Sequence, residues 1–493
     1  MNNHSNEKEN IDQNELTQPI LTVSSQHIVG YFKEFIENSS QNDLNDLWDM
    51  IDDNGSTPLH HIAEFDQSNE ILKTLFERAS RTKLNQALIM QDKNGATPLH
   101  VMAGSQTDQV FMFFLDKINK NTLNDALVVK KKNGQTLLSM SALYQSDEAF
   151  IALVKKVSQL AVNQALVIFD QDDWTPLHIV TEFQTLEAFL ILVENASKEV
   201  LNDSLLIDNP QGNTPLHIAA RRGSSDYLMT LVDIATPETC CYALVRPNAA
   251  GWTLLHLGAY YQSEEGFLVL VDKASSEALS EALVISNKYG MTPLHLSARY
   301  QRENAMMALL NKTTRESLNQ TIDVANDYGF TPLHFLIHYQ TQAVIKTMVE
   351  KVSPEAFNRA LVRIDSEGLT PLHSAALNLS DEDFLALMNK ASPEVINQVL
   401  GIDNQYSQLL RERVQIVKKK KSEAQIKVAS YWFAQCTRTD SGPRCFKDIP
   451  EDMQAVVAGF FANPKIHGDE EALIMAKDAL GWIETKRNAN FST

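Results

Sequence analysis

Apolar residues recur along this chain in short stripes with helical spacing, and polar turns separate the stripes. After Ser146, for example, Phe150, Leu153, Val154 and Val157 fall at positions i, i+3, i+4 and i+7, which places them on one face of a helix. The pattern predicts a series of short amphipathic helices, each of which must bury its apolar face against a neighbour.

One four-residue phrase sets the period of these helices. Thr-Pro-Leu-His opens seven times and has two degenerate forms, Thr-Leu-Leu-Ser and Thr-Leu-Leu-His. The nine opening residues are Thr57, Thr97, Thr136, Thr175, Thr214, Thr253, Thr292, Thr331 and Thr370, and they number repeats one to nine. The steps between them are 40 residues once and then 39 residues seven times. A fixed period of this length is typical of stacked repeats, so the chain is predicted to form a solenoid.

Three helix starts are predicted in each repeat. The opening Thr supplies a side-chain oxygen as N-cap, and Pro occupies the first helical position, where its missing N–H has no cost. A second cap follows ten residues later, and a third start is marked by phrases such as Ser353-Pro354-Glu355. Gly two residues before the opening Thr allows a turn with positive φ, and Asp173 replaces this Gly in repeat four.

The phrase Asp-x-x-Gly-x-Thr-Pro-Leu-His-x-x-Ala resembles the ankyrin repeat over roughly residues 52 to 400. The resemblance implies an all-α, ankyrin-type solenoid of about nine 39-residue units. Ankyrin units have about 33 residues, so we assign the additional residues here to an extra helical turn at the third start. HEAT-like repeats have a similar period but lack the Thr-Pro-Leu-His phrase. In the family, the His of this phrase braces the turn by hydrogen bonding.

Departures from the repeat divide the chain into three predicted parts. Residues 1–25 are expected to be a disordered tail, and residues 26–400 the solenoid, which begins with a half unit. Residues 401–493 are expected to form a degenerate capping unit and a small helical region, with helices at 408–433, 451–461 and 469–485. The charge changes at the same boundary: residues 1–400 hold 29 Lys and Arg against 50 Asp and Glu, and residues 401–493 hold 14 against 12.

Composition excludes several classes of protein. The formal charge of −19 does not suit a protein that coats nucleic acid or an anionic membrane. Four cysteines in 493 residues do not make a disulfide scaffold and suggest a reducing compartment. The N-terminus is polar and mixed in charge, so no Sec-type signal peptide is expected there, and the apolar runs are too short for a membrane span. We therefore expect a cytoplasmic-type soluble protein.

No enzyme motif is recognised, so no catalytic residue, metal or cofactor is assigned. The His of the phrase recurs at one fixed position, which favours a structural role over catalysis. A recurring Asn, as in Asn124, Asn163 and Asn202, is expected to be satisfied between neighbouring repeats. Cys436 and Cys445 lie close together in sequence, but a zinc site would need two further ligands. Two thiols are the default for this pair, with a conditional disulfide as the alternative.

An aromatic residue stands eight positions after the opening Thr in six repeats. The candidates for partner binding at this position are Phe65, Tyr144, Phe183, Tyr261, Tyr300 and Tyr339. In ankyrin repeats this end of the first helix lies toward the partner-facing side, which suggests a stripe of aromatic anchors. The alternative is packing between neighbouring units, because Gln follows in five of the six repeats.

Two basic segments are further candidates. Arg221 and Arg222 place two like charges in an acidic array and suggest contact with an acidic partner. Lys418, Lys419, Lys420 and Lys421 form a run within a predicted helix. This run suggests nuclear import through an importin or contact with anionic lipid, and the alternative is a solvated helix face.

The expected function is non-catalytic protein binding on the ankyrin surface. The long repeats and the Asn, Gln and Lys-rich style resemble ankyrin effectors that intracellular bacteria inject into host cells, and the acids near the C-terminus resemble type IV secretion signals. This resemblance implies a host protein as partner and secretion without a Sec signal peptide. Two alternatives remain: an enzyme with its active site in 401–493, and an endogenous cytosolic scaffold or inhibitor subunit.

Overall fold

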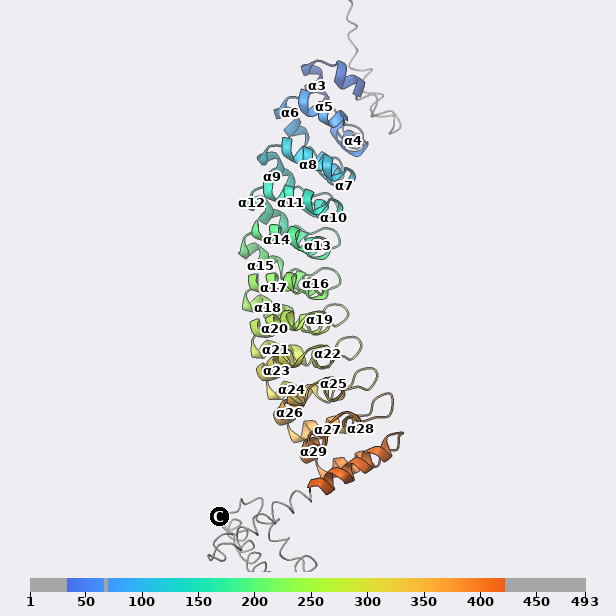
Figure 1. Cartoon of the computed structure of the whole chain (residues 1–493). Helices are drawn as coiled ribbons and strands as arrows, with labels where there is room; N and C mark the ends of the chain where they lie inside the picture. The colour runs from blue at the N-terminus through green and yellow to red at the C-terminus, as the bar shows by residue number, and fades with distance from the viewer. Residues whose placement is uncertain (1–32, 66–69, 422–493) are drawn as a thin grey trace, which may run out of the picture. The chain divides into compact units, whose positions relative to one another are not determined.

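The computed structural model describes residues 33–65 and 70–421. Within these ranges the regular structure is helical, apart from one isolated antiparallel bridge between Lys130 and Thr136. Three helices recur in each repeat (Figure 1). The described part of the chain is therefore all-α, as the resemblance implies.

The first helices begin directly after the opening Thr. They are α4 (Pro58–Phe65), α7 (Pro98–Ser105), α10 (Leu137–Tyr144), α13 (Pro176–Phe183), α16 (Pro215–Arg221), α19 (Leu254–Tyr261), α22 (Pro293–Tyr300), α25 (Pro332–Tyr339) and α28 (Pro371–Asn378). The second helices follow the second cap. They are α5 (Glu70–Arg78), α8 (Asp108–Lys117), α11 (Asp147–Lys156), α14 (Leu186–Glu194), α17 (Ser225–Ile234), α20 (Glu264–Lys273), α23 (Glu303–Lys312), α26 (Gln342–Lys351) and α29 (Asp381–Lys390).

The additional residues of each repeat form a third helix of two turns. The third helices are α3 (Gln41–Leu47), α6 (Arg81–Ala87), α9 (Lys120–Val128), α12 (Gln159–Leu166), α15 (Lys198–Ser204), α18 (Pro237–Val245), α21 (Ser276–Leu283), α24 (Arg315–Thr321), α27 (Pro354–Leu361) and α30 (Pro393–Leu400). Residues 33–38 and 407–421 are also helical. The third start signal is confirmed, since Ser197, Thr236, Ser353 and Ser392 cap these helices with their side chains.

The chain divides into two compact units. One extends to Asp327 and includes Tyr339–Val352, and the other contains Tyr328–His338 and continues from Ser353. Inside the first unit, helices of the same kind pack against each other in consecutive repeats, as in α7 with α10, α11 with α14 and α18 with α21 (Figure 1). Inside the second unit, α27 packs against α28 and α30.

Each turn before a first helix depends on a left-handed residue. Gly134 has φ of 80°, and an added Cβ would lie 2.5 Å from Asp170 Cα. The corresponding glycines of the other repeats also have positive φ. Asp173, which replaces Gly in repeat four, takes the same conformation with φ of 53°. The turn therefore also forms with Asp in place of Gly, although a side chain strains the backbone in this conformation.

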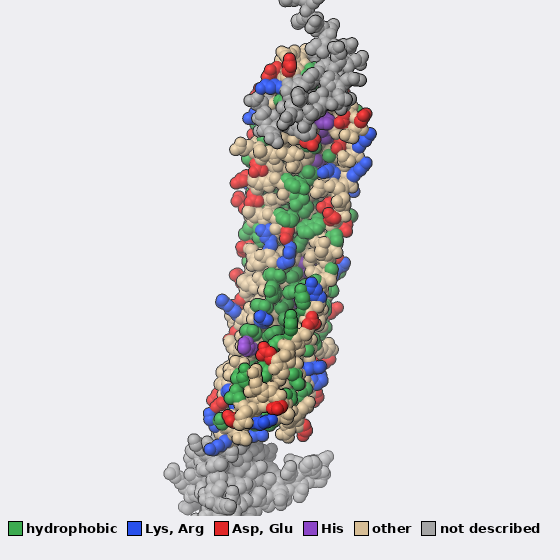
Figure 2. All heavy atoms as spheres, turned by 90° about the vertical axis from the view of Figure 1, so that its right-hand side faces the viewer, with side chains coloured by type: hydrophobic (Ala, Val, Ile, Leu, Met, Phe, Trp, Pro, Cys, Tyr) green, Lys and Arg blue, Asp and Glu red, His purple; other side chains and the backbone are tan. Residues whose placement is uncertain are grey.

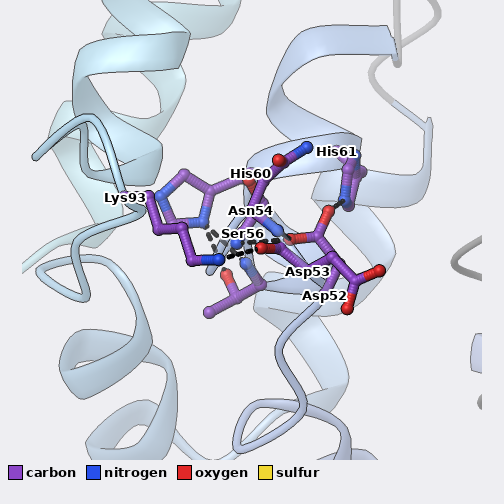
Figure 3. A network of polar contacts seen from close by, with 8 residues as sticks. Asp52, Asp53, Asn54, Ser56, His60, His61 and Lys93 are labelled. Atoms are coloured by element: carbon purple, nitrogen blue, oxygen red, sulfur yellow. Dashed lines mark hydrogen bonds and ion pairs between the residues drawn. The ribbon is translucent and has the colours of Figure 1, made fainter.

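The His of the repeated phrase braces its own turn by hydrogen bonding, as expected, and also bonds to the next repeat. In repeat one, the Thr57 N–H donates to His60 Nδ1 at 3.0 Å, so this nitrogen is an acceptor and His60 Nε2 carries the proton. That Nε2–H donates to the Ala96 carbonyl at 3.0 Å, in the turn of the next repeat. Figure 3 shows His60 beside Asn54 and Ser56 of its own turn and Lys93 of the next turn. The same bond joins His178 to Asn213 and His256 to Met291. Burial lowers the pKa of His100, His178, His217, His256 and His334 to about 4.

The recurring Asn is also satisfied between neighbours. Asn124 Oδ1 accepts from the Ser158 N–H at 2.8 Å, and Asn163 Oδ1 accepts from the Ser197 N–H at 2.8 Å. Each bond joins one third helix to the start of the next. The apolar stripe around Phe150 is fully buried, so the core runs between the first and second helices.

Several predictions concern residues outside the described ranges. They are the tail at 1–25, the Cys436–Cys445 pair and the helices expected at 451–461 and 469–485. The helix expected at 408–433 is described over residues 407–421. The boundaries 26–400 and 401–493 stay predictions.

Candidate functional site

A buried Gln joins the first helices of successive repeats. It stands nine positions after the opening Thr, one position after the aromatic residue. Gln145 Nε2 donates to the Ala103 carbonyl at 2.9 Å, and Gln301 Nε2 donates to the Ala259 carbonyl at 3.0 Å. Equivalent bonds link Gln106 to Ala63, Gln184 to Ala142, Gln262 to Ala220 and Gln340 to Ala298. Recurrence alone could assign the stacking role to the Gln or to the aromatic residue. These hydrogen bonds assign it to the Gln.

The aromatic residues before this Gln point to solvent. Phe183 is 59% exposed and Tyr144 is 56% exposed, and Tyr261, Tyr300 and Tyr339 are also exposed. The side chain of Phe65 lies outside the described part of the structure. Figure 2 shows hydrophobic side chains gathered in a column over the first helices. Exposed rings at regular intervals on one face are a chemistry that protein interfaces favour.

Four rings in repeats six and seven form one cluster. The Tyr260 ring lies 4.6 Å from that of Tyr261 and 4.8 Å from that of Tyr300, centroid to centroid. Trp252, which precedes the opening Thr253, lies 5.7 Å from Tyr260 and 6.5 Å from Tyr261. Burial, together with a hydrogen bond to the Tyr260 side chain, raises the pKa of Tyr300. We call Trp252, Tyr260, Tyr261 and Tyr300 the aromatic cluster.

An arginine extends the aromatic cluster into repeat eight. The Arg299 guanidinium carbon lies 5.3 Å from the Tyr300 ring centroid and 5.8 Å from that of Tyr339. Both distances are within the range of cation–π contacts. Sequence reasoning included Tyr261, Tyr300 and Tyr339 but missed Trp252, Tyr260 and Arg299. The doubled Tyr260-Tyr261 was the available signal, because every other repeat has at most one Phe, Tyr or Trp there.

Arg221 and Arg222 have different surroundings. Repeat five has Gly223 where six other repeats have the stacking Gln, and Arg222 takes over its role. The Arg222 guanidinium donates to the carbonyls of Thr181 and Glu182 at 2.8 and 2.7 Å. Arg221 makes an ion pair with Glu182 at 2.7 Å, and its side chain is half exposed. Of the two, Arg221 is thus the residue more able to meet a partner.

The lysine run lies on the solvent side of the helix at 407–421, whose Leu410, Val414 and Val417 are buried. All four lysines are exposed. Lys420 pairs with Asp381, and Lys421 donates to Asn389 Oδ1 at 2.9 Å. The hydrogen bond from Lys420 lowers the pKa of Asp381. At least these two lysines therefore also contact a neighbouring second helix, α29.

The described residues offer little for reaction chemistry. The repeat histidines are buried, and in repeats one, four, five, six and eight the Nε2 atom hydrogen-bonds to a backbone carbonyl. Burial raises the pKa of Cys240 to about 12, so its thiol stays protonated. No group of three or more His, Cys, Asp or Glu side chains is placed to hold a metal ion in the ranges 33–65 and 70–421. None of the helices described there is long and apolar enough to cross a membrane.

Comparisons with known proteins agree with the repeat. A family model described as ankyrin repeats in three copies matches residues 158–239 and 198–278. No curated protein matches the chain. One solved structure, the ankyrin repeat domain of Bcl-3, described as a unique member of the IkappaB protein family, is 18% identical. It covers 52% of this chain and 99% of its own, with a TM-score of 0.33. The family model thus identifies residues 158–278 as ankyrin repeats, and the recurring phrase and the stacked helices continue the same repeat on both sides of this segment.

Proposed function

We propose that this protein is a non-catalytic scaffold that binds another protein through the ends of its first helices. The observation that carries the proposal is the division of labour between two adjacent positions. Gln holds the repeats together from a buried position, while the aromatic residue before it stays exposed. A ring that the stack does not require, repeated on one face, is best explained by contact with a partner.

The aromatic cluster is the centre of the proposed interface. Its rings contact one another, so their conformations are restricted before a partner arrives, which reduces the entropy lost on binding. Tyr and Trp also combine large apolar area with a polar group, a property enriched at binding hot spots.

A paired comparison of variants tests this proposal. The full chain carrying Tyr261→Ala and Tyr300→Ala should no longer capture proteins that the unmodified chain captures from a lysate. Its melting temperature should be nearly unchanged. Leu160→Ala is the matched control, since Leu160 is exposed and lies on a third helix, α12. Capture of the same proteins by all three chains would contradict the proposal. A large fall in melting temperature would instead assign the rings to packing.

A second part of the proposal concerns the cell in which the protein acts. The repeat length and residue style support an effector delivered into a host cell, where it would bind a host protein. A translocation reporter fused to the full chain should be delivered, and removal of residues 469–493 should abolish delivery. Equal delivery of the two chains would argue against a C-terminal signal, and delivery of neither would favour an endogenous scaffold.

A further inference from the structure

The binding face has its largest excess of positive charge in repeats five to seven. Four positions per repeat belong to this face: the two at the tip of the turn, and the two that stand seven and eight positions after the opening Thr. In repeats five to seven these positions are 210–211, 249–250, 288–289, 221–222, 260–261 and 299–300. They hold four cations, Arg221, Arg222, Lys288 and Arg299, and no acid.

The same positions elsewhere have the opposite balance. In repeats one to four they hold two lysines against four acids, namely Asp53, Glu64, Asp172 and Glu182. In repeats eight and nine they hold the acids Asp327 and Glu367 and no Lys or Arg. The chain has a formal charge of −19, yet Lys and Arg exceed Asp and Glu on this face where the aromatic cluster lies.

Contacts orient two of these cations along exposed rings. Arg299 lies against the rings of Tyr300 and Tyr339, and Lys288 Nζ lies 5.0 Å from the Tyr289 ring centroid. Arg221 is held at its end of the face by the ion pair with Glu182. Arg222 differs, because it donates to backbone carbonyls of repeat four. The face therefore offers apolar rings with cations on several sides.

We propose that repeats five to seven seat a short protein segment in which Asp or Glu side chains alternate with apolar or aromatic ones. The inference rests on the proposed function and adds the chemistry of the partner. Opposite charge favours encounter and disfavours other partners, while the rings supply the buried area. A nucleic acid is the less suitable occupant, because a long polyanion would also meet the acids of the adjacent repeats.

Selection from a random-peptide display library on the full chain tests the inference. Acidic peptides with apolar or aromatic residues should be enriched, and their binding should weaken as salt is raised. Arg221→Gln with Arg299→Gln should reduce their affinity by about tenfold or more. Lys155→Gln with Lys346→Gln removes the same charge from exposed positions on second helices and should leave the affinity unchanged.

The outcomes separate this inference from the proposed function. Peptides that depend on Tyr261 and Tyr300, but are not acidic and do not respond to the arginine variant, would overturn the inference and leave the binding face intact. Peptides that bind independently of both tyrosines would contradict the face itself. If poly-uridine RNA binds as tightly as the selected peptides, the occupant of this face is a nucleic acid and not an acidic protein segment. Absence of any enriched peptide would count against the inference.

Discussion

The buried repeat histidines predict that acid destabilises this protein. Five of them have a pKa of about 4 in the folded chain, against 6.5 for an exposed imidazole. Below pH 6.5 the unfolded chain therefore binds protons that the folded chain does not bind. The free energy of unfolding must then fall as the pH decreases from 6.5 toward 4.

The size of the effect follows from the two pKa values. At pH 5, one histidine with these values lowers the free energy of unfolding by roughly 2 kcal/mol. The five together reach on the order of 10 kcal/mol, which equals the whole stability of a typical domain. Simple net charge predicts the reverse: the sequence pI is about 5.1, so approaching pH 5 relieves the repulsion among the excess acids.

Urea unfolding followed by circular dichroism at pH 7 and pH 5 measures this difference. The unfolding midpoint should fall markedly at pH 5. His256→Ser is the matched variant, because repeat three has Ser139 at the same position and it accepts the Thr136 N–H at 2.9 Å. This variant should be less stable at pH 7 and lose less on acidification. A midpoint that stays constant or rises at pH 5 would refute the reasoning.

Three further predictions concern single features. Arg222→Ala should lower the free energy of unfolding by about 1 to 2 kcal/mol, because it removes the hydrogen bonds to repeat four. Arg221→Ala should change the free energy of unfolding little. Equal losses for the two variants in chemical unfolding would contradict this prediction. Asp173→Gly should raise the melting temperature and Gly134→Ala should lower it, since both positions need positive φ; effects of the same sign would exclude backbone strain. Replacement of Lys418–Lys421 by Gln should change the location of a fluorescent fusion in cells, and an identical distribution would leave the run as a solvated face.

The sequence predicts the helices well because each start depends on residues close together in the chain. Thr caps, Pro at the first position and Gly in the turn act locally, and the structure has a helix at each of these signals within the described ranges. The role of the third start is confirmed for the same reason. The local code even accommodates Asp173, which adopts the conformation expected of Gly.

The binding face was less predictable because it depends on which residue meets the neighbouring repeat. Gln and the preceding aromatic residue recur equally, so periodicity alone cannot say which is buried. Arg222 is recognised as a substitute for Gln only when the carbonyls of repeat four are in place. Trp252 likewise contacts the cluster from a different position of the same repeat, and Arg299 contacts a ring of the next repeat.

Hydrogen–deuterium exchange of the full chain, with and without a peptide enriched from the display library, tests the central claim most directly. The account predicts that protection increases in 249–262 and 288–301, where the first helices and turn tips of repeats six and seven lie. Protection confined to third helices such as α18 and α21, or no change at all, would contradict a binding face built from the exposed rings.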